Sequence, residues 1–64
     1  MSTEEKIRLI TDVRAAIYAL GRILDGGHHE IEKSEPLYTE CMAALSTLTM
    51  MELGLVEQVG TDSL

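Results

Sequence analysis

The feature that most constrains the fold of this chain is an uncharged run from Cys41 to Met51, which reads CMAALSTLTMM. A surface helix usually carries a charged face opposite its apolar face, whereas a helix that is apolar or neutral all round is covered on several sides. A chain of 64 residues has little else with which to cover such a helix. The run therefore predicts contact with a second copy of the chain or with another protein.

The length of the chain limits it to a single domain over residues 1–64. A domain of this size buries only about 60% of the surface that its unfolded chain exposes, so its stability is marginal unless something reinforces it. Cys41 is the one cysteine, which excludes an intrachain disulfide, and no paired Cys or Cys/His spacing predicts structural zinc. Oligomerisation is the remaining means of stabilisation.

The charge of the chain is acidic, with a formal net charge of -6. All five Lys and Arg residues precede Ser34, and the segment from Ser34 to Leu64 carries five acids and no base. This distribution disfavours binding to nucleic acid or to an anionic membrane surface, because both depend on Lys and Arg. The chain has no apolar window of transmembrane length, and MSTEEKIR has acids where a signal peptide would have its basic region. We therefore expect a cytoplasmic location.

The first half of the chain predicts an amphipathic helix over about residues 3–24. Ser2 and Glu5 fit the S-x-x-E capping box that opens a helix. Apolar residues then recur in steps of three and four, and Leu9, Ala16 and Ile23 widen this stripe on one flank. The members of the stripe are Ile10, Val13, Ile17, Leu20 and Leu24.

A joint over about residues 25–34 and a second helix over about residues 35–58 follow. Asp25-Gly26-Gly27 ends the first helix, and Ser34 is the predicted N-cap of the second, with Pro36 in its first turn. We expect this helix to end at Gln58, with Gly54 as an alternative end, and residues 59–64 to fray. Its apolar stripe comprises Leu37, Cys41, Ala44, Leu48, Met51 and Leu55.

The two segments predict an all-α fold, a hairpin of two antiparallel helices that dimerises into a four-helix bundle. The two stripes would form the dimer core. The length and the helix-joint-helix layout are similar to those of the Rop family of dimeric four-helix bundles. This likeness implies the architecture alone, because no binding motif of that family is present.

Five residues of the second segment lie off the main stripe, and the packing of one hairpin explains them poorly. We predict that they form an interface with a partner protein or with a second copy of the chain. They are Met42, Leu45, Thr49, Met50 and Leu53.

Two further patterns are candidates for ligand binding. The stretch LGLVEQV from Leu53 to Val59 resembles the turn into the wing of winged-helix DNA-binding domains, but the helix before it has no Lys or Arg with which to bind DNA. The joint offers candidate metal ligands, although adjacent histidines on a loop usually point apart, and a solvated joint is the favoured interpretation. These candidates are His28, His29, Glu30 and Glu32.

The sequence offers no catalytic constellation and no cofactor motif, so it predicts a protein that is not an enzyme. Cys41 lies on the apolar stripe, which favours a structural role for its thiol. The leading hypothesis is a small regulator or adaptor that binds another protein, of the inhibitor or anti-activator type. The alternative is an acidic mimic of nucleic acid that blocks the basic site of a nucleic-acid-binding protein. Their different dependence on salt distinguishes them.

Overall fold

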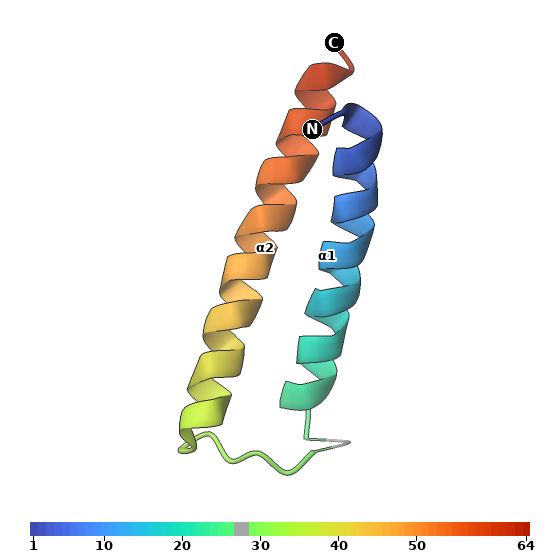
Figure 1. Cartoon of the computed structure of the whole chain (residues 1–64). Coiled ribbons are helices and arrows are strands. Elements are labelled where there is room, and N and C mark those ends of the chain that lie inside the picture. Colours follow the sequence, from blue (N-terminus) through green and yellow to red (C-terminus); the bar gives the residue numbers. More distant parts are fainter. Residues whose placement is uncertain (27–28) are drawn as a thin grey trace.

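The chain forms a hairpin of two long antiparallel helices in a computed structural model that describes residues 1–26 and 29–64. The helices are α1 (Thr3–Leu24) and α2 (Pro36–Asp62), and both termini lie at the end opposite the joint (Figure 1). The part of the chain that is described contains no strand. The prediction of an all-α helical hairpin is confirmed.

The beginning of α1 shows the predicted capping box. Ser2 has an extended backbone, its Oγ accepts a hydrogen bond from the backbone N–H of Glu5 at 3.1 Å, and its own N–H donates to Glu5 Oε1 at 3.3 Å. These two bonds satisfy donors that the first turn of a helix otherwise leaves unpaired. At the other end, Gly26 adopts a φ of 76°, a left-handed conformation that glycine adopts without strain.

The beginning of α2 differs from the prediction, because Glu35 and not Ser34 is the N-cap residue. Glu35 has an extended backbone with ψ of 139°, and its side chain makes no capping hydrogen bond. Proline disfavours helical geometry in the residue before it, so Pro36 prevents the helix from starting any earlier. The prediction of Ser34 as the cap was wrong for this reason.

The end of α2 lies beyond the predicted end at Gln58. The helix passes through Gly54 without interruption and ends at Asp62, so most of the tail that was expected to fray is helical. Leu53 to Val59 lie inside this helix, which excludes the turn of a winged-helix domain there. Contacts of Asp62 with Thr3 and Lys6 of α1 hold this last turn against the start of the chain.

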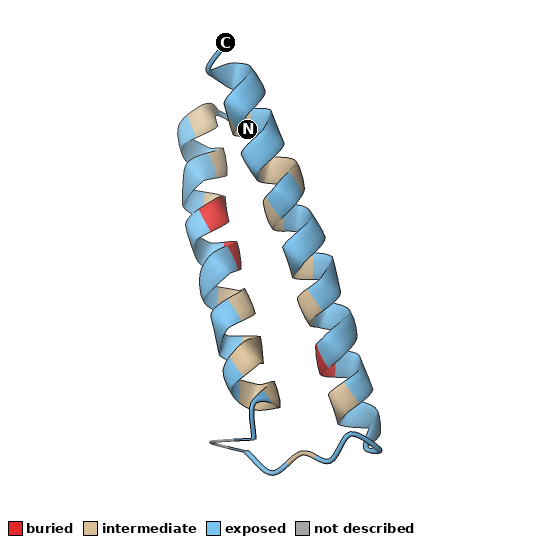
Figure 2. Ribbon diagram, turned by 180° about the vertical axis from the view of Figure 1, so that it is seen from behind, coloured by how far each residue is buried: buried red, intermediate tan, exposed pale blue. Residues whose placement is uncertain are grey.

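The contact between α1 and α2, here called the seam, has a very small core. Its most buried residues are Ile10, Val13 and Cys41. Figure 2 shows the buried segments of the two helices on the sides that face each other. The remaining seam residues are mostly half-buried. The seam comprises Thr3, Lys6, Ile10, Val13, Ile17, Leu20 and Leu24 of α1, and Tyr38, Cys41, Leu45, Leu48, Glu52, Leu55, Val59 and Asp62 of α2.

The orientation of α2 within the hairpin turns only half of the predicted stripe toward α1. Cys41, Leu48 and Leu55 face α1 as expected, but Leu37, Ala44 and Met51 are exposed beside the seam. Their places are taken by the residues one position later along the chain, which are Tyr38, Leu45 and Glu52. The apolar surface of α2 is wide enough to allow either orientation, so its sequence periodicity alone could not choose between them.

Candidate protein-binding surfaces

Polar contacts join the two helices at two places along the seam. In the middle of the seam, Arg14 Nε donates to Glu52 Oε2 at 2.8 Å, with the Arg14 side chain 63% exposed and that of Glu52 25% exposed. This pairing lets a carboxylate occupy a position between Leu48 and Leu55 that would otherwise favour an apolar residue. It accounts for the inward position of Glu52, which the sequence pattern did not predict.

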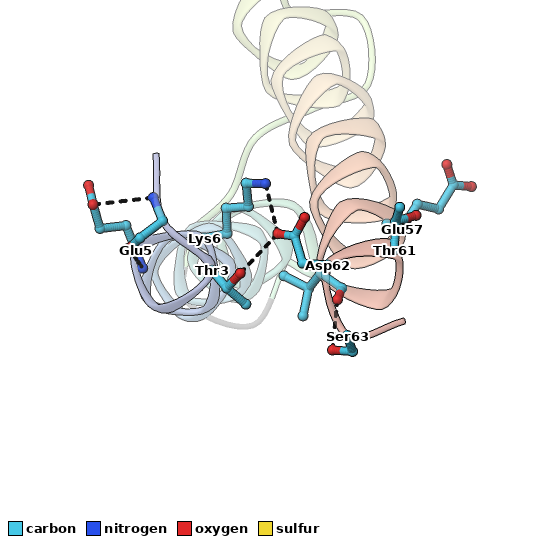
Figure 3. Close-up of polar contacts among 9 residues, drawn as sticks. Thr3, Glu5, Lys6, Glu57, Thr61, Asp62 and Ser63 are labelled. Atoms are coloured by element: carbon cyan, nitrogen blue, oxygen red, sulfur yellow. Dashed lines mark hydrogen bonds and ion pairs between the residues drawn. The ribbon is translucent and has the colours of Figure 1, made fainter.

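A second polar cluster joins the open end of the hairpin. Lys6 Nζ lies 2.9 Å from Asp62 Oδ2, and the Thr3 hydroxyl donates to the same oxygen at 3.0 Å. Figure 3 shows Thr3 and Lys6 of α1 pointing toward Asp62 of α2. The hydrogen bond from Lys6 and, after it, the hydrogen bond from Thr3 lower the pKa of the Asp62 carboxyl below its ordinary value of 3.8.

One side of the hairpin, here called the uncharged side, carries apolar residues from both helices. On each helix they form a row at intervals of seven residues, each just before an inward-facing residue, and in an antiparallel pair two such rows lie on the same side of the seam. The exposed acids Asp12 and Glu40 lie at the outer edge of this side. The three residues from α1 are half-buried, and the three from α2 are exposed. The uncharged side comprises Leu9, Ala16 and Ile23 of α1, and Leu37, Ala44 and Met51 of α2.

The side of α2 that points away from the uncharged side also exposes apolar residues. Met50 is 70% exposed and Leu53 is 59% exposed, while Met42, Thr49 and Val56 are exposed nearer the seam. These five residues define the outer face of α2, and none of them is charged. Met50 and Leu53 are three residues apart, so their side chains are neighbours on the helix surface, and a contiguous apolar patch is the kind of surface that another molecule can cover.

The outer face contains four of the five residues that the sequence predicted as an interface, namely Met42, Thr49, Met50 and Leu53. The fifth, Leu45, is half-buried in the seam, and its packing against α1 explains it without a partner. Val56 was missed by the sequence analysis. Its spacing of seven residues from Thr49 places it in the same row of the helix, and this spacing is the signal that could have found it.

The joint shows no arrangement of metal ligands among the residues that the structure describes. His29, Glu30 and Glu32 are exposed, and no group of three His, Cys, Asp or Glu side chains is close enough there to hold an ion. His28, the fourth candidate, lies outside the described residues. Cys41, placed on the apolar stripe by the sequence, is a buried free thiol of the seam.

Neither helix of the described chain is long and apolar enough to cross a membrane. Comparison of the chain with protein-family models, with curated proteins and with solved structures finds no match. The class that the geometry itself defines is a two-helix hairpin with a small core and two exposed uncharged surfaces, one beside the seam and one on the outer face of α2.

Proposed function

We propose that this chain is a small non-enzymatic regulator or adaptor of the inhibitor or anti-activator type, which binds another protein and works as a homodimeric four-helix bundle. The observation that carries the proposal is the outer face of α2. Met50 and Leu53 are more than half exposed there, on a helix without an exposed base. Exposed methionines adapt their shape to a partner at little cost, which suits a surface that binds another protein.

The small core supports the dimeric part of the proposal. The described residues include three buried ones, none of them below 2% exposure, and this gives a chain of this size little burial with which to offset its conformational entropy. The Cα radius of gyration is 14.3 Å, against about 11 Å for a compact domain of the same length. Association of two hairpins would bury surface that one hairpin leaves in water.

The charge pattern of the structure favours this proposal over the acidic mimic. A mimic presents carboxylates in a row to replace phosphates, and α2 has four acids, Glu40, Glu52, Glu57 and Asp62. Arg14 and Lys6 engage two of the four within the hairpin itself. The acids that remain on the surface of α2 are too widely spaced to resemble a phosphate backbone.

The test is affinity capture from extracts of cells that express the protein, with three versions of the chain compared. Met50→Glu places a charge in the outer face of α2, and Ala15→Glu adds the same charge on the exposed surface of α1. We expect a protein that the wild type and Ala15→Glu retain and Met50→Glu loses, because burying an unpaired charge opposes binding. Identical capture by all three chains would contradict the assignment of this face.

Ionic strength provides the second arm of the same experiment. Contacts through the outer face of α2 are apolar, so capture should persist when salt is raised from low to moderate concentration. Capture that collapses with salt and is unaffected by Met50→Glu would favour the acidic mimic instead.

A further inference from the structure

We infer that a second copy of this chain packs on the uncharged side of the hairpin, and that the outer face of α2 stays open in the resulting dimer. This inference rests on the proposed homodimer and specifies the surface through which it forms. Met42 and Met50 would then remain available to a different partner.

The apolar stripe of each helix extends beyond the seam. On α1 the stripe extends from the seam toward Leu9, Ala16 and Ile23, and on α2 it extends toward Leu37, Ala44 and Met51. Both extensions lie on the same side of the hairpin. In a four-helix bundle each helix has two neighbours, so its apolar stripe must face the second neighbour as well as the first. The hairpin has this pattern on one side.

The exposed area of the hairpin is larger than that of a compact folded protein of the same mass. The hairpin exposes 4795 Å². A folded protein of its mass of 7.1 kDa is expected to expose about 4,100 Å², so the excess is roughly 700 Å². A stable interface of standard size takes about 800 Å² from each partner. The excess is therefore close to what one copy contributes to a dimer.

The opposite side of the seam differs from the uncharged side because it carries a charge at its centre. There Arg14 is 63% exposed above its contact with Glu52, which places a charge in the middle of that side. On the uncharged side, the row of Leu9, Ala16 and Ile23 and the row of Leu37, Ala44 and Met51 carry no charge next to the seam, and the acids Asp12 and Glu40 lie farther from the seam. The centres of homodimer interfaces are depleted of charge, and a two-fold axis brings the same surface of each copy together. The two apolar rows of the uncharged side are free of charge, and a two-fold axis beside them would bring the same rows of both copies together.

Two adjacent alanines provide a matched pair of variants. Ala43 and Ala44 are both exposed on α2. Ala44 lies on the uncharged side, whereas Ala43 lies seven residues before Met50 and points away from α1 as Met50 does. Each becomes a glutamate, which keeps helix propensity and adds the same charge. In sedimentation equilibrium at micromolar concentration, Ala43→Glu should remain a dimer like the wild type. Ala44→Glu should weaken dimerisation on the order of a hundredfold, because it buries an unpaired charge.

Two adjacent methionines provide a test on the unaltered protein. Met51 lies on the uncharged side and is 42% exposed in the hairpin, whereas Met50 lies on the outer face of α2. Hydrogen peroxide converts exposed methionine to the sulfoxide, and mass spectrometry reads each position separately. As protein concentration is raised and the dimer forms, oxidation of Met51 should slow several-fold while oxidation of Met50 keeps its rate. This measurement decides the question even if Ala44→Glu fails to fold.

The outcomes separate the two proposals. A wild-type chain that stays monomeric throughout removes the homodimer and this inference with it. A dimer that survives Ala44→Glu, or in which Met50 is protected and Met51 is not, overturns the choice of face and leaves the homodimer standing. Dissociation by Ala44→Glu alone, together with protection of Met51 alone, supports the uncharged side.

Discussion

Arg14 Nε lies 2.8 Å from Glu52 Oε2, and this contact joins the middle of α1 to the middle of α2 across an otherwise apolar part of the seam. Because Glu52 faces α1, the residue before it, Met51, is turned out of the seam. In this orientation of α2, Leu45 packs inside the hairpin and Met51 is left exposed.

Replacing Glu52 with leucine should leave the hairpin as stable as before or stabilise it by up to about 1 kcal/mol, because a half-buried ion pair gains little over apolar packing. Arg14→Ala should instead lower the free energy of unfolding by about 1 kcal/mol or less, since it leaves the half-buried carboxylate of Glu52 without its cation. Thermal melts at one fixed protein concentration measure both changes. A larger loss for Glu52→Leu than for Arg14→Ala would contradict this account of the seam.

Acid should weaken the open end of the hairpin through Asp62. Its pKa is lowered by the hydrogen bonds from Lys6 and Thr3, so its contribution to stability is complete above the ordinary value of 3.8 and is lost as pH falls through the lower value of the folded state. The difference in melting temperature between wild type and Asp62→Asn should therefore be constant from pH 7 to about 5 and shrink below about 4. An NMR titration of the Asp62 carboxyl with a midpoint at or above 3.8 would show that these bonds do not persist in solution.

Removing the hydroxyl of Ser2 should destabilise the protein, whereas removing that of Ser34 should not. Ser2 Oγ caps α1, and Ser→Ala at such a position costs about 1 kcal/mol. Ser34 precedes the N-cap residue of α2, which is Glu35, so Ser34→Ala should change stability by less than about 0.5 kcal/mol. Denaturant titrations of the two variants test this, and equal losses would show that α2 begins at Ser34 after all.

Gly54→Ala should stabilise the protein by up to about 1 kcal/mol, because alanine favours the helix and a Cβ at Gly54 would meet nothing within 4 Å. Gly26→Ala should destabilise it by about 1 kcal/mol, since Gly26 has a φ of 76° that other residues adopt with strain. Thermal melts would show shifts of opposite sign. A loss of stability in Gly54→Ala would indicate that another molecule packs closely on this part of α2.

The sequence by itself determined the local structure of this protein. The capping box of Ser2 and Glu5, the glycine turn at Gly26 and the two apolar periodicities act within a few residues, so the hairpin and the bounds of α1 could be predicted from them. The outer face of α2 could be predicted in large part for the same reason. Met42, Met50 and Leu53 lie off the stripe in either orientation of the helix.

The rotation of α2 and its end were decided by tertiary contacts. The stripe of α2 is wide enough to face α1 with either Leu45 or Ala44, and the orientation in the structure is the one in which Glu52 accepts a hydrogen bond from Arg14, a residue far away in the sequence. In the same way, Asp62 ends a helix that local signals would have ended sooner, because Lys6 and Thr3 hold it from the other helix. Contacts between distant residues leave no periodic trace in the sequence, and here they set which face of α2 is buried.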